Sequence, residues 1–169
     1  MLVVADATPL ISLMKIGRLN LLEQLFGEVV IPEAVYSELT TNVTFAEEIY
    51  QIEVCEFINR VSVEDNKSVD VLRRATGLDL GESEAIIYAD ENGANILLID
   101  EVKGRRIAQT MGLKIMGTLG MLLEAFYKGL LTSDETEADM IRLRESNRHI
   151  GDELVQYVRD KIRAERYLK

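Results

Sequence analysis

Cysteine and histidine are almost absent from this chain of 169 residues, which has one of each, Cys55 and His149. A single thiol excludes an intramolecular disulfide and any zinc cage built from several cysteines. A cysteine protease is disfavoured because it needs a thiol paired with an imidazole. We expect Cys55 to be a small buried side chain, and nothing marks His149 as catalytic.

Long apolar runs are also missing, since none approaches the ~18 residues of a membrane-spanning helix. The chain starts directly with the strand-like residues 2–4 and lacks the basic and longer apolar regions of a signal peptide. We therefore expect a cytoplasmic protein with no membrane partner.

Positive charge is scarce, because 19 Lys and Arg stand against 29 Asp and Glu, a net charge of −10. Affinity for nucleic acids rests on Lys and Arg against phosphates, so a general polyanion-binding protein is disfavoured. Any contact with nucleic acid must be local, assisted by a metal ion, or shared with a partner. The hydrophobic fraction of 47% and the charged fraction of 28% are typical of an ordinary folded domain.

Apolar strand-like runs alternate with helical patterns along the chain. Strands are predicted at 2–6, 29–31, 96–100 and 114–116, with a further short or edge strand at 54–58. The first helix is predicted to open at Thr8 as N-cap and Pro9 as first helical residue, and to end at Gly17. Further helices are predicted at 19–26, after Pro32, and at 44–51, 65–76, 82–92, 103–111, 118–128, 133–145 and 152–166.

This alternation predicts βαβ units, and hence an α/β fold in which a central, mostly parallel sheet of about five strands lies in a three-layer α/β/α sandwich. We expect one domain over residues 1–130 and a helical C-terminal extension over 131–169 that packs on it. A chain of this length buries roughly two-thirds of its unfolded surface and needs no covalent staple.

Four acidic residues stand at the exits of predicted strands or early in the helices that follow: Asp6, Glu38, Glu82 and Asp100. In a parallel α/β sheet these positions share the carboxyl edge, where ligands bind. Carboxylates gathered there repel one another unless a divalent cation neutralises them, and hard cations such as Mg²⁺ take oxygen ligands. The pattern favours a metal site, and two such ions can drive phosphodiester hydrolysis.

Three of these acids also have an ordinary explanation: Glu82 favours the dipole of its helix, Asp100 can be a turn residue, and Glu38 can be solvated. The nearby Asp79 can cap the same helix as Glu82. Only a shared site explains Asp6, Glu38, Glu82 and Asp100 together.

An ordered set of short motifs resembles the PIN-domain family. The set comprises Asp-Ala-Thr-Pro-Leu-Ile at 6–11, Ile-Pro-Glu-Ala-Val-Tyr-Ser-Glu at 31–38, Gly-Glu-Ser-Glu-Ala-Ile at 81–86, Leu-Ile-Asp-Glu at 98–101 and Gly-Arg-Arg at 104–106. A Leu-Asp-x-Gly-Glu stretch at 78–82 and a Gly-Thr-Leu-Gly stretch at 117–120 are similar to a poorly characterised PIN-like subgroup. The resemblance runs in order from residue 2 to about 130.

The resemblance implies a Mg²⁺- or Mn²⁺-dependent ribonuclease of VapC type, often the toxin of a VapBC-like toxin–antitoxin pair and usually a homodimer. It places the four acidic positions on Asp6, Glu38, Glu82 and Asp100, with Glu101 as an auxiliary metal ligand. This chain departs from the family in having Glu82 where Asp is usual, and Leu98 where a threonine usually precedes the last acid. Leu98 cannot provide the hydroxyl of that threonine, so the site lacks it unless Thr8 or Thr118 supplies one.

Polar and basic residues near these acids are candidates for binding RNA: Thr8, Lys103, Arg105, Arg106 and Thr118. Arg105 and Arg106 can equally pair with neighbouring carboxylates. The alternative to the ribonuclease is a catalytically weak or inactive PIN-like binding module. A phosphatase that uses Asp6 as nucleophile is disfavoured, because position 8 is Thr where an Asp-x-Asp pair is needed.

Overall fold

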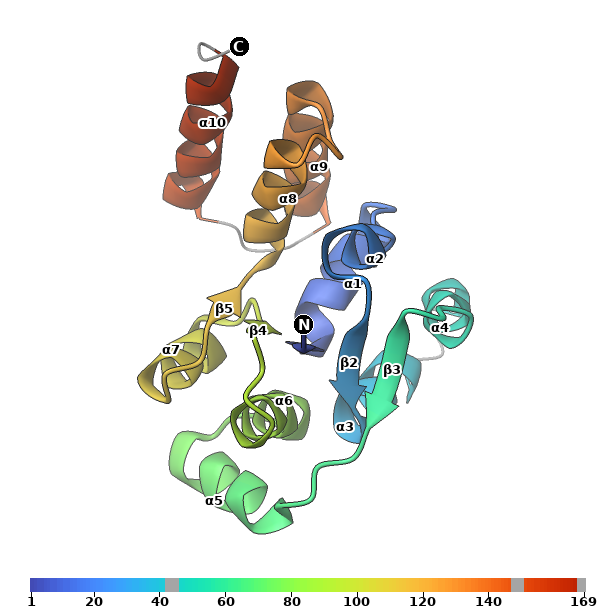
Figure 1. Ribbon diagram of the computed structural model, residues 1–169, viewed down its shortest axis with the longest axis vertical. Helices are drawn as coiled ribbons and strands as arrows, with labels where there is room; N and C mark the ends of the chain where they lie inside the picture. The colour runs from blue at the N-terminus through green and yellow to red at the C-terminus, as the bar shows by residue number, and fades with distance from the viewer. Residues whose placement is uncertain (42–45, 147–150, 167–169) are drawn as a thin grey trace.

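Five short strands form one sheet and are joined by helices (Figure 1). The computed structural model describes residues 1–41, 46–146 and 151–166, so His149 lies outside the described residues. Every strand pairing is parallel, and the predicted α/β/α architecture is confirmed. The elements are β1 (Val3–Ala5), α1 (Ala7–Lys15), α2 (Leu21–Phe26), β2 (Val29–Pro32), α3 (Glu33–Thr41), α4 (Ala46–Glu53), β3 (Ile58–Val61), α5 (Asn66–Thr76), α6 (Leu80–Glu91), β4 (Ile96–Leu98), α7 (Val102–Thr110), β5 (Ile115–Met116), α8 (Thr118–Tyr127), α9 (Ser133–Glu145) and α10 (Asp152–Arg166).

The strands lie in the order β3-β2-β1-β4-β5, with β1 in the centre. Val4 of β1 is in register with Val30 of β2 on one side and with Leu97 of β4 on the other. The chain builds outward through β2 and β3 and then crosses to β4 on the opposite side of β1. The strand order therefore reverses between β1 and β4, and parallel α/β sheets bind ligands outside the carboxyl ends of strands at such a point.

Burial on both faces explains why the central strands are apolar runs rather than alternating ones. Val3, Val4 and Ala5 of β1 are each at most 1% exposed, as expected of a strand covered by helices on both sides. Helix α6 packs against β1, β2 and β4 and is flanked by α3, α5 and α7. Its small residues, such as Gly81 and Ala85, are accordingly buried.

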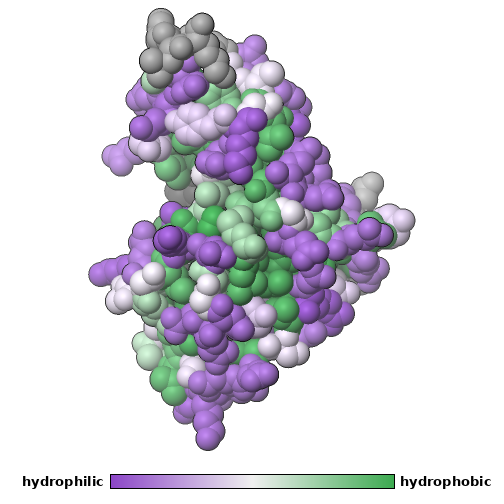
Figure 2. Space-filling view, in the orientation of Figure 1, coloured by the Kyte–Doolittle hydropathy of each residue, from purple (hydrophilic) through white to green (hydrophobic). Residues whose placement is uncertain are grey.

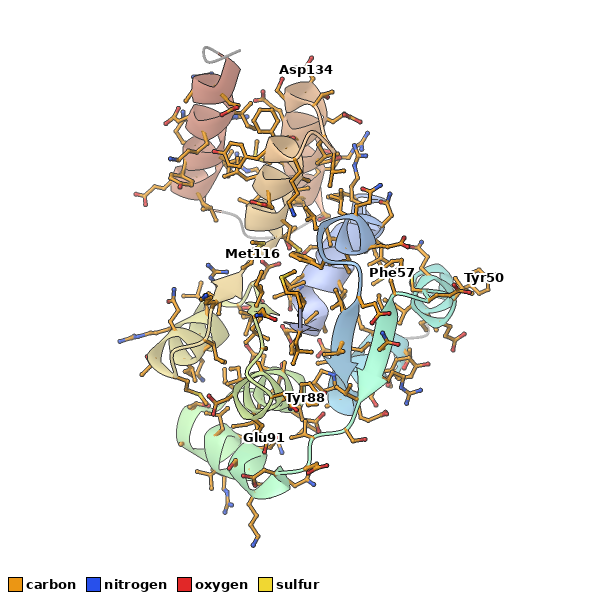
Figure 3. All side chains as sticks on the ribbon, viewed as in Figure 1. Tyr50, Phe57, Tyr88, Glu91, Met116 and Asp134 are labelled. Atoms are coloured by element: carbon orange, nitrogen blue, oxygen red, sulfur yellow. The ribbon has the colours of Figure 1, made fainter. Side chains whose placement is uncertain are left out.

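The last three helices pack against one another beyond β5 and form the upper part of the molecule in Figure 1. Figure 3 places Met116 where the sheet meets α8. On the face drawn in Figure 2, hydrophilic residues cover most of the surface, and hydrophobic ones gather near its middle. Among the described residues, no helix has the length and apolar character that a membrane span requires.

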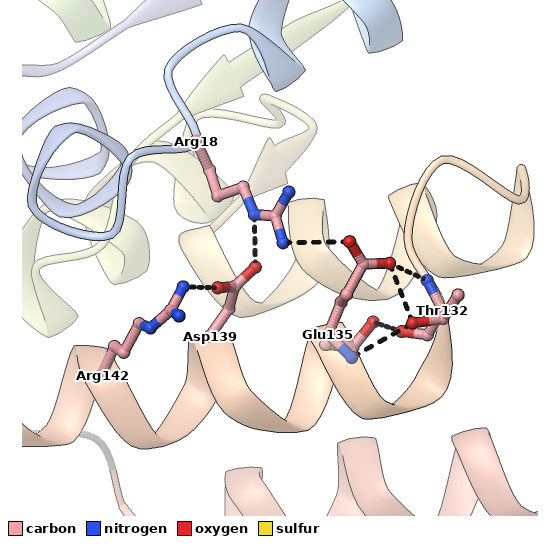
Figure 4. A network of polar contacts seen from close by, with 6 residues as sticks. Arg18, Thr132, Glu135, Asp139 and Arg142 are labelled. Atoms are coloured by element: carbon pink, nitrogen blue, oxygen red, sulfur yellow. Dashed lines mark hydrogen bonds and ion pairs between the residues drawn. The ribbon is translucent and has the colours of Figure 1, made fainter.

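An ion-pair network centred on the buried Asp139 attaches α9 to the turn between α1 and α2 (Figure 4). The Asp139 carboxylate is 0% exposed and accepts from Arg18 Nε at 2.7 Å and from Arg142 Nη1 at 3.1 Å. Arg18 also reaches Glu135, whose side chain completes a capping box with Thr132 at the start of α9. A buried carboxylate is tolerated here because two guanidinium groups face it.

The short strand predicted over 54–58 is misplaced, because β3 begins only at Ile58. The amides of Val54 and Cys55 instead donate to the carbonyls of Tyr50 and Ile52 and so extend the last turn of α4. Cys55 is a free thiol that is half-buried rather than fully buried.

Candidate functional site

Asp6 stands at the central position of the carboxyl edge, between the end of β1 and the start of α1. Its backbone amide donates to the Leu98 carbonyl at 2.9 Å, which ties it to β4. The residue is 2% exposed and occupies the N-cap position of α1 without capping that helix through its side chain. Thr8 lies inside α1, so its predicted role as N-cap is wrong, because the helix begins at Ala7, two residues before the predicted first helical residue Pro9.

The electrostatics of Asp6 show which acids surround it. Burial and, to a smaller extent, the negative charges of Glu38, Glu82 and Asp79 raise the pKa of the Asp6 carboxyl from its ordinary 3.8 to about 7, against the lowering effect of a hydrogen bond from the Ala7 amide. Desolvation and like charge both penalise the ionised form of a carboxylate. The fold therefore brings three of the four predicted acids, Asp6, Glu38 and Glu82, to one place.

Glu82 is 8% exposed and lies in the first turn of α6. Asp79 Oδ1 accepts from the Glu82 amide at 2.7 Å, and Glu82 Oε2 accepts from the Asp79 amide at 3.3 Å, which forms a capping box. The prediction that Asp79 caps this helix is confirmed. Burial raises the pKa of Glu82, and the charges of Asp79 and Glu101 add to that rise, whereas Lys103 lowers it.

Glu38 projects from α3 toward the first turn of α6. A Cβ atom on Gly81 would lie 3.1 Å from Glu38 Oε2, so the two helices approach closely where the side chain passes. Gly104 similarly makes room for Glu82, because a Cβ atom there would lie 2.8 Å from Glu82 Oε1. Glycines thus leave space for both carboxylates.

Asp100 follows β4 and is held by the residue that begins α8. Its Oδ1 accepts from the Thr118 amide at 2.7 Å, and its Oδ2 accepts from the Thr118 hydroxyl at 2.6 Å. Thr118 is 4% exposed, and its hydroxyl and amide both face Asp100. The hydroxyl that Leu98 cannot provide is therefore supplied by Thr118.

The basic residues after Asp100 differ in their surroundings. Arg105 Nη1 donates to the Ile99 carbonyl at 2.9 Å and supports the end of β4. Lys103 and Arg106 are exposed on the first turns of α7. Glu101 is exposed at the N-cap position of α7 and makes no side-chain cap there.

Comparison with known proteins agrees with this geometry. A family model described as a PIN domain matches residues 2–164, which is nearly the whole chain. The chain belongs to the PIN domain family. No curated protein matches the chain.

The PIN fold is a nuclease-type fold, and PIN domains generally use divalent metal ions. The charged side chains that act on Asp6 are carboxylates, and carboxylate oxygens suit a hard cation such as Mg²⁺ or Mn²⁺. In residues 1–41, 46–146 and 151–166 as they stand, no three His, Cys, Asp or Glu side chains form a group that could hold a metal ion. The carboxylate oxygens of this PIN domain are therefore suitable ligands for the cation, and the carboxylates would have to move closer together to bind it.

One contact of this PIN domain site was not anticipated from the sequence. Glu84 Oε2 accepts from the Ala34 amide at 2.9 Å and so links α6 to the first turn of α3. The sequence does indicate that this helix needs a cap from elsewhere, because it starts directly after Pro32, which has no side-chain oxygen to accept from its first amides. The partner lies 50 positions away, which no local pattern reveals.

Proposed function

We propose that this PIN domain is a metal-dependent endoribonuclease that hydrolyses RNA phosphodiesters with Mg²⁺ or Mn²⁺. The observation that carries the proposal is the buried Asp6 carboxyl, whose pKa is about 7 and which faces Glu38 and Glu82 beside the reversal of strand order. A fold gains nothing in stability from like charges held together in a buried place. A bound cation neutralises the repulsion between these carboxylates and so explains why they are held together.

In this proposal Asp6, Glu38 and Glu82 hold the cation, while Asp100 and Glu101 complete the acidic edge. The cation supplies a water of lowered pKa as the attacking group. Asp6 must be ionised to bind it, and Thr118 fixes the orientation of the Asp100 carboxylate.

Contacts with the RNA backbone come from the start of α7. Lys103 and Arg106 are exposed there and offer donors to phosphate oxygens, whereas Arg105 is engaged with the Ile99 carbonyl. Because the net charge is −10, the contact with RNA is confined to this patch and to the cation. Of the remaining candidates, Thr8 is half-buried on α1, and the Thr118 hydroxyl is engaged with Asp100.

The test is cleavage of RNA by the purified protein with Mg²⁺ or Mn²⁺, and its loss in Asp6→Asn. Asp90→Asn is the matched control, because Asp90 is exposed near the other end of α6. We expect the control to cleave like the wild type. Equal cleavage by Asp6→Asn and the wild type would contradict the assignment.

The proposal extends to partners. The PIN domain family often acts as the toxin of a VapBC-like pair, and we propose a cytoplasmic homodimer that binds a small antitoxin. We expect the neighbouring reading frame to encode a short DNA-binding protein. That protein should co-purify with this chain and block its cleavage of RNA. Light scattering on the purified chain tests the dimer.

A second candidate is a PIN-like module that binds without cleaving. It is favoured by the engagement of both Asp100 oxygens with Thr118, and by the lack of a preassembled ligand group in the described residues. Calorimetric titration with Mn²⁺ separates the two candidates. Binding that Asp6→Asn removes supports the enzyme, and no binding at millimolar Mn²⁺ supports the module.

A further inference from the structure

Helix α3, which carries Glu38, starts without a cap from its own neighbours. Strand β2 ends at Pro32, whose side chain has no hydrogen-bonding atom, and α3 begins at the next residue. The Glu33 carboxylate is turned to Arg60 Nη2 at 2.6 Å. The first amides of a helix have no partner within it, so they need an acceptor from elsewhere.

Glu84 of α6 provides that acceptor. Its Oε2 lies 2.9 Å from the Ala34 amide, in the first turn of α3. A carboxylate at this position also interacts favourably with the positive end of the helix dipole. The contact adds a hydrogen bond between two helices that pack directly on each other.

The same face of α6 also meets α3 one turn further along. Gly81 precedes Glu84 by three residues, a spacing that puts both on one side of a helix. A Cβ atom at Gly81 would lie 3.1 Å from Glu38 Oε2 and 3.5 Å from Val35 Cγ2. The Glu84 bond to Ala34 and the close approach of the two helices at Gly81 therefore fix successive turns of α3, and Glu38 stands on the second of them.

The two glutamates of the Gly-Glu-Ser-Glu motif diverge. Glu82 Oε1 approaches Gly104 of α7, to within 2.8 Å of where a Cβ atom would be, while Glu84 reaches α3. We propose that Glu84 is a positioning residue: it caps α3 and thereby sets where Glu38 stands at the metal site. This inference rests on the proposed function, in which Glu38 binds the cation.

The experiment compares Glu84→Ala with Glu84→Gln in the full chain. The glutamine keeps a carbonyl oxygen for the Ala34 amide, and the alanine does not. We expect Glu84→Ala to speed hydrogen exchange at the Ala34 amide and to weaken Mn²⁺ binding about tenfold, as supporting contacts of metal ligands do when lost. We expect Glu84→Gln to remain close to the wild type in both measurements.

Two further variants separate positioning from general stability. Asp65→Ala removes a comparable cap from α5, where Asp65 Oδ1 accepts from the Ser68 amide at 3.0 Å. It should lower the melting temperature and leave Mn²⁺ affinity unchanged. Gly81→Ala adds the methyl group that crowds Glu38, and it should weaken Mn²⁺ binding while the Ala34 amide stays protected.

Three outcomes overturn the inference. If Glu84→Gln loses as much Mn²⁺ affinity as Glu84→Ala, the charge of Glu84 is needed and Glu84 is itself a ligand. If Glu84→Ala frees the Ala34 amide but leaves Mn²⁺ affinity unchanged, the cap does not position Glu38 and the proposed function stands. If the wild-type chain binds no Mn²⁺, the proposed function falls and takes the inference with it.

Discussion

Thr118 holds the Asp100 carboxylate at both oxygens, through its amide at 2.7 Å and its hydroxyl at 2.6 Å. Gly117 allows this approach, because a Cβ atom there would lie 2.8 Å from Asp100 Oδ1 and equally close to Arg105 Nη1. The first two residues of the Gly-Thr-Leu-Gly motif, Gly117 and Thr118, therefore hold the Asp100 carboxylate in place.

Replacing Thr118 by valine keeps its shape and removes the hydroxyl donor. A hydrogen bond to a charged group contributes about 1.5–3 kcal/mol, and because Asp100 is partly exposed we expect a loss of about 1 kcal/mol in urea unfolding. Cleavage of RNA should fall because Asp100 is less well oriented. Thr118→Ser keeps the donor and should restore both, and a serine variant as impaired as the valine one would contradict the role of the hydroxyl.

The raised pKa of Asp6 makes the stability of the metal-free protein depend on pH. In the folded state the pKa is about 7, and in the unfolded state it is near 4, so the folded protein binds the proton more tightly. Stability is therefore greatest below pH 4 as far as Asp6 is concerned, and it falls as pH rises through 7, by about 4 kcal/mol. Asp6→Asn should remove this slope and raise the melting temperature at pH 8.

Chemical unfolding at several pH values measures the effect, with the wild type and Asp6→Asn compared in chelator. Asp90→Asn, exposed on α6, should follow the wild type. A wild-type stability that does not fall between pH 4 and 8 relative to Asp6→Asn would show that the Asp6 carboxyl is already ionised at low pH.

Mn²⁺ should compete with the proton on Asp6. Below pH 7 the carboxyl is protonated, so we expect Mn²⁺ affinity to fall as the pH drops. A ligand that binds only the folded state raises its stability by mass action. Saturating Mn²⁺ should therefore raise the melting temperature of the wild type at pH 8 more than at pH 5, and a shift of the same size in Asp6→Asn would place the ion elsewhere.

Much of this fold could be predicted because its signals are local. Each central strand is a buried apolar run, and Asp6 and Asp100 follow such runs directly, so their place at one edge follows from parallel pairing. The edge strand β3 was predicted at 54–58, too early along the chain, because its residues are exposed or half-buried and its apolar signal is weak. Contacts such as Glu84 with Ala34 were not predictable, since they depend on how two distant helices pack.

Gly104 should tolerate no side chain, although it lies within a helix where alanine is normally favoured. A Cβ atom there would lie 2.6 Å from Ile99 Cδ1 and 2.8 Å from Glu82 Oε1. We expect Gly104→Ala to cost about 1–3 kcal/mol in urea unfolding, the usual result of overpacking. Gly120→Ala is the control, because its new Cβ meets only the flexible Met116 side chain, and equal stability of the two variants would contradict the close approach of α7.

The Arg18–Asp139 pair should be the ion pair whose loss costs most among those described. Asp139 is 0% exposed and lies 2.7 Å from Arg18 Nε. Arg18→Ala leaves that charge with Arg142 alone, and breaking a buried pair by removing one partner costs about 3 kcal/mol. The exposed pair of Arg144 and Asp152 is the matched control, since surface pairs contribute about 1 kcal/mol or less. Urea unfolding of Arg18→Ala and Arg144→Ala measures both, and equal losses would show that burial of Asp139 does not strengthen its dependence on Arg18.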